Sequence, residues 1–210
     1  MTAAAGQPAR AWWLKTLYRW HWISSAIALV GMLLFAATGL TLNHAAQIEA
    51  HPVVVDRQAR LPAALLAAHA PAAGASRHDG PLTPDLADWV AGALRVDVHG
   101  RSAEWSTDEI YVAMPRPGGD AWVRIDRASG EAELEDTSRG WVSYLNDLHK
   151  GRNAGTAWSW FIDAFAAACL VFSVTGLFIL KLHAGNRPGT WPLVGMGLVL
   201  PVLLAILFIH

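Results

Sequence analysis

The sequence predicts a membrane α-helical protein with three transmembrane helices and a small α+β domain inserted between the first and second helices. Hydrophobic residues make up 53% of the 210 residues and charged residues only 16%, which is unusual for a soluble protein. Three apolar runs are each long enough to cross a bilayer. Short alternating segments, separated by glycine-containing turns, lie between the first and second runs.

The three apolar runs predict transmembrane helices over residues 20–44, 156–183 and 190–210. They comprise Ile23 to Leu42, Ala164 to Leu180 and Trp191 to Ile209, and each can cross a hydrocarbon core of roughly 30 Å. Pro201 predicts a kink in the third helix. The first run, behind its basic leader, could instead be a cleaved signal peptide, but it exceeds the usual apolar core of about 7–15 residues. We therefore expect it to be retained.

Basic residues beside the short loops predict the orientation. They are Arg10, Lys15 and Arg19 in the leader, and Lys181 and Arg187 between the second and third runs. Neither segment contains an acidic residue, so we expect both to be cytoplasmic, with residues 1–19 as a cytoplasmic leader. Residues 44–156 would then be periplasmic and the protein would lie in a bacterial inner membrane. The net charge of −1 gives no indication of nucleic-acid binding.

The segment over residues 45–155 contains the predicted α+β module, at about 83–137. Residues 61–84 are rich in Ala and Pro and are interpreted as a linker, with a helical turn or two at 63–70. Thr83 to Leu94 begins with an N-cap residue and a proline, which predicts a helix. Alternating segments predict strands over Ala103–Trp105, Glu109–Met114, Ala121–Asp126 and Glu131–Glu135.

A six-residue pattern, FxxTGL, occurs once in the first apolar run and once in the second. The copies are Phe35–Leu40 and Phe172–Leu177. Because consecutive spans run in opposite directions, the two copies indicate a short repeat with inverted topology. Small residues are also common where membrane helices pack closely, so packing alone could account for the pattern. Gly39 and Gly176 would in addition let a flat macrocycle approach the backbone.

Histidines lie at both ends of the first two predicted helices, and they are the candidate haem ligands. If the helices pack side by side, His21 would meet His183 at one membrane face and His44 would meet His149 at the other. The 23 residues from His21 to His44 span roughly 34 Å of helix. Facing imidazoles are natural axial ligands of a low-spin haem iron, so two pairs would hold two haems and one real pair would hold one.

Haem at these positions would be of the b type, because the sequence has no CxxCH motif and its single cysteine lies in an apolar run. Each histidine taken alone is equally compatible with an ordinary residue at the lipid interface. Asp163, near the start of the second span, is interpreted as a hydrogen-bond partner of His44 or His149, since an unpaired carboxylate there is costly. Compensation of the helix dipole at the start of the span and a proton or cation site are the alternatives. The histidines at 51, 69, 78 and 99 lack ligand-like spacing.

Two stretches, LNDLHKGRNAGTAWSWFIDAF followed by FSVTGLFIL, and RWHWISSAIALVGMLLFAATGLTLNH near the amino terminus, resemble the PepSY-associated transmembrane (PepSY_TM-like) family. The segment IDRASGEAELED is similar to the strand–turn–strand pattern of PepSY modules. The resemblance covers residues 12 to 183. It implies a relation to haem-containing inner-membrane reductases that act in iron–siderophore uptake, and the four histidines match the positions where those proteins hold haem.

The resemblance thus implies an electron carrier that reduces a periplasmic acceptor, such as a ferric siderophore or another metal chelate. With three spans, this chain is smaller than those reductases, and a homodimer would supply further helices. No flavin or dinucleotide motif occurs, so electrons would come from quinol or a cytoplasmic reductase. The alternative is a membrane-tethered PepSY module that binds or regulates a periplasmic partner such as a peptidase, without redox activity. A metal sensor or permease accessory using the same histidines is a third interpretation.

Overall fold

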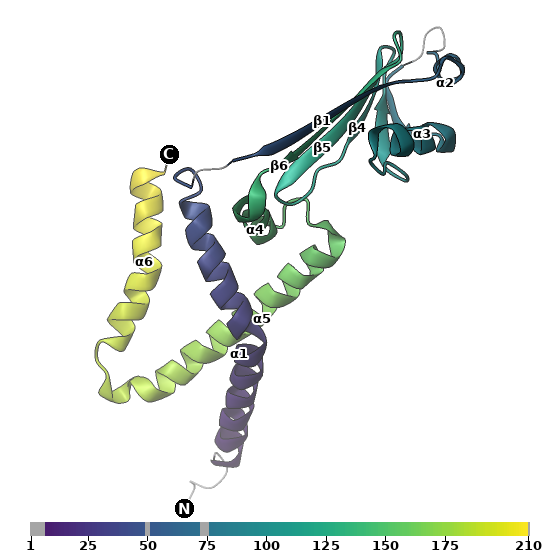
Figure 1. Cartoon of the computed structure of the whole chain (residues 1–210). Helices are drawn as coiled ribbons and strands as arrows, with labels where there is room; N and C mark the ends of the chain where they lie inside the picture. Colours follow the sequence, from purple (N-terminus) through teal and green to yellow (C-terminus); the bar gives the residue numbers. More distant parts are fainter. Residues whose placement is uncertain (1–6, 49–50, 72–75, 210) are drawn as a thin grey trace, which may run out of the picture. The chain divides into compact units, whose positions relative to one another are not determined.

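A computed structural model describes residues 7–48, 51–71 and 76–209 of the chain (Figure 1). The chain divides into two compact units, each described by itself below. The first contains Met1–Leu34 with Phe161–His210, and the second contains Phe35–Trp160. Two long helices, α1 (Gln7–Asn43) and α5 (Gly155–His183), take part in both units.

Three helices are long and apolar enough to cross a membrane, which confirms the predicted count for the described residues. Besides α1 and α5, the third is α6 (Thr190–Phe208), which stays one helix through Pro201. Their large apolar side chains are mostly exposed, as expected for surfaces in contact with lipid. Helix α1 begins well before the predicted residue 20, so residues 7–19 of the predicted leader are helical rather than a separate segment.

The second unit contains a six-stranded sheet that lies between α1 and α5 in the sequence. The strands are β1 (Val53–Arg60), β2 (His78–Pro81), β3 (Ser102–Trp105), β4 (Glu109–Ala113), β5 (Gly119–Asp126) and β6 (Glu131–Ser138). They are ordered β1-β6-β5-β4-β3-β2, and every neighbouring pair is antiparallel. The α+β class of the inserted region is therefore confirmed.

The core of the module, here residues 53–138, forms between the sheet and helix α3 (Pro84–Leu94) (Figure 1). Strand β5 alternates buried and partly exposed positions, which places Val123 and Ile125 on the face that α3 covers. Leu86, Val90 and Leu94 recur at helical spacing and are fully buried. Burying each such side chain contributes roughly 1.5–3 kcal/mol before entropy costs.

The module begins earlier than the predicted residue 83. The predicted linker over 61–84 contains helix α2 (Ala63–Ala68) and strand β2, and β1 precedes it. Strand β1 was not predicted because apolar and polar residues do not alternate in its sequence, VVVDRQAR. In the structure the strand is exposed at nearly every position. Its ladder with β6, from Val53 opposite Ser138 to Arg60 opposite Glu131, holds it in the sheet through backbone hydrogen bonds.

A helix that the sequence analysis missed, α4 (Gly140–Lys150), follows the sheet. It ends at Gly151, whose φ of 67° lies in the left-handed region that glycine adopts at helix C-termini. His149, expected just before the second span, instead lies in the last turn of α4. The chain then turns again at Gly155, with φ of 79°, where α5 begins.

Candidate functional site

His21 of α1 packs against the second FxxTGL copy, Phe172–Leu177 on α5, here called the second motif. Its Nδ1 lies 3.0 Å from the hydroxyl oxygen of Thr175 and 3.2 Å from the carbonyl oxygen of Phe172. The imidazole stacks on the Phe172 ring, with 4.8 Å between ring centroids and 16° between planes. The His21 side chain is thus fixed by the motif's aromatic ring and its hydroxyl.

The hydroxyl of Thr175 determines which nitrogen of His21 has the proton. This hydroxyl donates to the carbonyl oxygen of Val171 at 2.6 Å, as threonines in helices commonly do. A hydroxyl has a single hydrogen, so toward His21 it can only accept. Nδ1 of His21 is therefore the N–H, and Nε2 presents a lone pair.

The first FxxTGL copy, Phe35–Leu40 on α1 and here called the first motif, receives His149 from α4 in the same way. Nδ1 of His149 lies 2.7 Å from the hydroxyl oxygen of Thr38, and the two rings of Phe35 and His149 are 4.9 Å apart. Thr38 donates to the carbonyl oxygen of Phe35, so it again accepts from the histidine. Each motif thus contacts one histidine through the same two residues.

The glycine of each motif lies beside the same histidine. A Cβ on Gly176 would be 3.3 Å from Cε1 of His21, and a Cβ on Gly39 would be 3.6 Å from Cε1 of His149. The missing side chain lets the imidazole approach the helix backbone. The Phe, Thr and Gly of the FxxTGL pattern therefore lie against a histidine in both copies, which packing between helices alone would not require.

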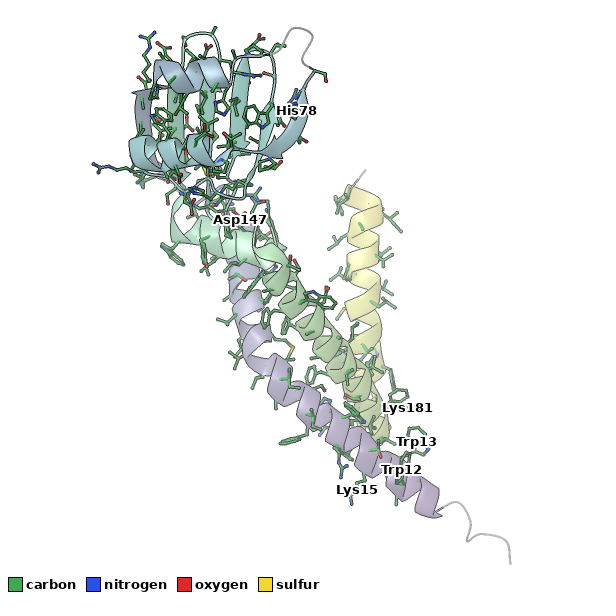
Figure 2. All side chains as sticks on the ribbon, turned by 90° about the vertical axis from the view of Figure 1, so that its right-hand side faces the viewer. Trp12, Trp13, Lys15, His78, Asp147 and Lys181 are labelled. Carbon is green, nitrogen blue, oxygen red and sulfur yellow. The ribbon has the colours of Figure 1, made fainter. Side chains whose placement is uncertain are left out.

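Buried polar residues of α4 hold His149 in place. Asp147 is 3% exposed, and its carboxylate accepts the N–H of Gly118 at 2.9 Å and pairs with Arg152 at 2.6 Å. Asn146, 8% exposed, accepts a hydrogen bond from the hydroxyl of Thr41 at 3.0 Å. These bonds connect α4 to the turn between β4 and β5 and to the end of α1, where the first motif lies; Figure 2 shows Asp147 on α4.

The other two candidate histidines also donate from Nδ1. Nδ1 of His183 lies 2.8 Å from the carbonyl oxygen of Ile179, and its Nε2 faces the hydroxyl of Tyr18 at 3.4 Å. Nδ1 of His44 lies 2.7 Å from Oε1 of Gln47. His183 and His44 are both exposed, whereas His21 and His149 are half-buried.

The predicted pairs are not in contact: His21 contacts Thr175, eight residues before His183 on α5, and His149 contacts Thr38, six residues before His44 on α1. Tyr18, the partner of His183, precedes His21 by three residues on α1. Thr41 precedes His44 by three residues, and its partner Asn146 precedes His149 by three. Among the described residues, no hydrogen bond or ring contact joins His21 to His183 or His44 to His149.

Asp163 is exposed on α5, and within the described part of the chain it makes no hydrogen bond or ion pair. Its predicted role beside His44 or His149 stays a prediction. The described residues also contain no group of three or more His, Cys, Asp or Glu side chains that could hold a metal ion, but a bis-histidine haem needs no such group.

Two histidines of the module differ from the four candidate ligands, because hydrogen-bond partners contact both of their ring nitrogens. His69 contacts the carbonyl oxygen of Leu65 and the hydroxyl of Thr83. His99 lies between Asp97, at 2.8 Å from Nδ1, and Asp88, at 3.0 Å from Nε2. Hydrogen bonds to Asp97 and then to Asp88 raise the pKa of His99 above its usual 6.5. Both nitrogens being occupied, neither ring is available as a ligand.

Sequence reasoning missed the partners that orient the imidazoles, namely Tyr18, Thr38, Gln47 and Thr175. The signal for the two threonines was present, since Thr is an invariant letter of the repeated pattern. It was interpreted as a small residue for close packing. Tyr18 and Gln47 have no comparable pattern.

Comparison with known proteins identifies one family. The model of the PepSY_TM-like family matches residues 12–210, nearly the whole chain. No curated protein and no solved structure matches the chain.

Proposed function

The chain belongs to the PepSY_TM-like family, and from this premise we propose that it is a membrane b-type haem protein that passes electrons across the bilayer. The single observation that most supports this proposal is that four imidazoles have the same hydrogen-bonding pattern at Nδ1. All four candidate histidines donate a hydrogen bond from Nδ1. His21 donates to the hydroxyl of Thr175, and His149 donates to that of Thr38. His44 donates to the side-chain oxygen of Gln47, and His183 donates to the carbonyl oxygen of Ile179.

An imidazole that donates from Nδ1 presents Nε2 as its coordinating atom. A hydrogen bond from the other ring nitrogen is the usual companion of a metal-bound histidine, because it fixes the tautomer and the ring orientation and makes the ligand more basic. Among the described contacts, Nε2 of His21, His44 and His149 has no hydrogen-bond partner, and Nε2 of His183 has only Tyr18 at 3.4 Å. The donor chemistry of these residues therefore fits a haem iron.

We propose that His21 and His183 would hold one haem and His44 and His149 a second. When bound, haem supplies reversible one-electron chemistry at its iron. The chain supplies the ligand atoms, the oriented hydrogen bonds behind them and, through Gly39 and Gly176, space beside the backbone for the imidazoles of His149 and His21. Because His21 contacts Thr175, eight residues before His183, and His149 contacts Thr38, six residues before His44, bringing each pair to one iron would require a shift of more than one helical turn along the helices.

The direction of electron flow follows from the expected orientation. His21 and His183 lie toward the basic leader and the Lys181–Arg187 connection, which we expect to be cytoplasmic. A quinol or a cytoplasmic reductase would donate there. The pair near the module would pass the electron to an acceptor outside the bacterial inner membrane, such as a ferric siderophore or another metal chelate. A homodimer would supply the further helices that the larger reductases contain.

The experiment that tests this proposal is a reduced-minus-oxidised visible spectrum of the detergent-purified protein, with haem counted per chain. We expect a low-spin b-type spectrum and up to two haems per chain. His21→Ala and His149→Ala should each remove one haem, and His78→Ala, in the exposed part of the module, should remove none. A colourless protein after expression with ample haem, or unchanged spectra of both variants, would refute the haem proposal.

A second candidate function has one observation in its favour. Strand β1 is an edge of the sheet, and Val53, Val54 and Val55 are 62%, 48% and 41% exposed. An exposed apolar edge strand can pair with a strand of another protein. The module would then tether a partner such as a peptidase. Recovery of that partner with the wild-type protein but not with Val54→Lys, together with the absence of haem, would favour this function.

A further inference from the structure

A groove in the first unit lies between the start of α1 and the end of α5, and none of the histidines lines it. Its volume is about 410 Å³, within the range of small-molecule sites, roughly 300–1,000 Å³. Trp13, Leu14 and Leu17 of α1 line one side, and Phe178 and Leu182 of α5 line the other. These walls are apolar over almost their whole length.

Two cationic residues also line this groove, Arg10 from α1 and Lys181 from α5. Figure 2 shows Trp13 and Lys181 at the same end of the two helices. Neither cation makes an ion pair among the described residues. Moreover, the sequence of α1 contains no acidic residue, and none follows Asp163 in the rest of the chain. The positive charge at the groove is therefore not neutralised from within the first unit.

We propose that this groove is a binding site for an anionic phospholipid, with the phosphate between Arg10 and Lys181 and an acyl chain along the apolar walls. The occupant must be apolar along most of its length and negatively charged at one end, and it must reach the site from the bilayer. An anionic phospholipid meets all three conditions. Basic pockets between membrane helices commonly bind such headgroups, and flanking tryptophans such as Trp12 and Trp13 suit the headgroup layer.

The proposal predicts headgroup selectivity that depends on two cations rather than on total charge. Replacing both with glutamine, as Arg10→Gln with Lys181→Gln, should weaken binding of phosphatidylglycerol about 25-fold, since each cation near a lipid phosphate is worth about fivefold and separate sites add. The matched control is Lys15→Gln with Arg19→Gln, which removes the same charge from α1 residues that do not line the groove.

The experiment is a titration of the full-length protein with dioleoyl phosphatidylglycerol and dioleoyl phosphatidylcholine, with bound lipid counted by native mass spectrometry. We expect tighter binding of phosphatidylglycerol, loss of that preference in the Arg10/Lys181 variant and its retention in the Lys15/Arg19 control. Leu17→Trp, which fills the groove, should weaken binding of both lipids. Equal binding of the two lipids by the wild type, or equal losses in the two double variants, would overturn the proposal.

Discussion

The hydroxyl of Thr175 accepts a hydrogen bond from Nδ1 of His21 at 3.0 Å while it donates to its own helix. The same relationship joins Thr38 and His149 at 2.7 Å. In each case a threonine on one helix sets the tautomer of a histidine on another. This arrangement directs Nε2 away from the protein hydrogen bond and makes it the ligand atom of the proposed haem sites.

Replacing Thr175 with valine should weaken haem binding at His21. Valine keeps the shape of the side chain but cannot accept from Nδ1, so the ring loses its fixed orientation. Losing such a supporting hydrogen bond typically costs about 10- to 100-fold in metal affinity. The measurement is haem retention per chain during dilution in the presence of apomyoglobin as a haem acceptor.

Thr175→Ser is the matched control, because it retains the hydroxyl, and it should retain haem like the wild type. Thr38→Val should weaken binding of the haem proposed for His149 and leave the one proposed for His21 unchanged. If Thr175→Val and Thr175→Ser release haem at the same rate, the hydroxyl does not support the ligand.

Replacing Gly176 with leucine should displace His21. A Cβ at this position already lies 3.3 Å from Cε1 of His21, and the rest of a leucine side chain would occupy the space of the ring. We expect loss of one haem per chain and a lower unfolding temperature, measured by absorbance and by thermal denaturation in detergent. Gly197→Leu, on α6, is the control, because nothing lies within 4 Å of a Cβ there. Haem content that is equal in the two variants would contradict the role assigned to Gly176.

The sequence was sufficient for the three membrane helices and for the inner strands of the sheet, because both depend on hydrophobic patterns. Val112 and Val123 are buried at alternating positions, and α3 buries residues at helical spacing. Strand β1 is different, since its residues are exposed and its place depends on the ladder with β6. Such pairing depends on a partner more than 70 residues away in the chain, and no local pattern reveals it.

The candidate site, like the sheet, could be predicted only in part from the sequence, as the four histidines show. Their positions at the ends of the first two predicted spans were visible in the sequence, but their partners were not, and in the structure His21 lies inside α1 and His149 lies in α4. His149 was expected just before the second span, whereas it lies in the last turn of α4, which ends at Lys150 and is capped by Gly151. Its orientation is therefore set by α4 and by Thr38, two features that become apparent only when the chain is folded.

Replacing Asp147 with alanine should destabilise the module and release α4. The carboxylate is buried and accepts from the N–H of Gly118 and from Arg152, so its loss leaves the buried N–H without a partner. Arg152 is more than half exposed and can be rehydrated, which limits the expected loss to roughly 1.5–3 kcal/mol, as for a hydrogen bond to a charged group. Denaturant unfolding followed by tryptophan fluorescence gives the change in free energy of unfolding.

Asp147→Asn retains an oxygen for the N–H of Gly118 and should recover part of the lost stability. Asp79→Ala, an exposed aspartate of β2, should have little effect. A loss of stability at Asp79 as large as that at Asp147 would show that the buried contacts are not the cause.

Stability should depend on pH through His99, whose pKa is raised by Asp97 and Asp88. Because the folded protein binds this proton more tightly than the unfolded chain does, the stabilisation is fully present below the unfolded pKa of about 6.5. It is lost as pH rises through the higher folded pKa. The pKa of Asp97 is lowered, chiefly by the backbone N–H of His99, so its own contribution is lost only in acid, below about pH 4.

The two contributions separate in a pH series. Between about pH 6 and 8 the wild type should lose unfolding temperature more steeply than His99→Gln, because only the wild type releases the His99 proton in that range. His78→Gln, which removes a histidine without such a pair of carboxylates, should keep the wild-type slope.

Below about pH 4 the wild type should lose stability again as Asp97 is protonated. Identical slopes for the wild type and His99→Gln above pH 6 would mean that the ion pairs of His99 do not stabilise the fold. The dependence should also weaken at high salt, since all three side chains are exposed and screened by ions.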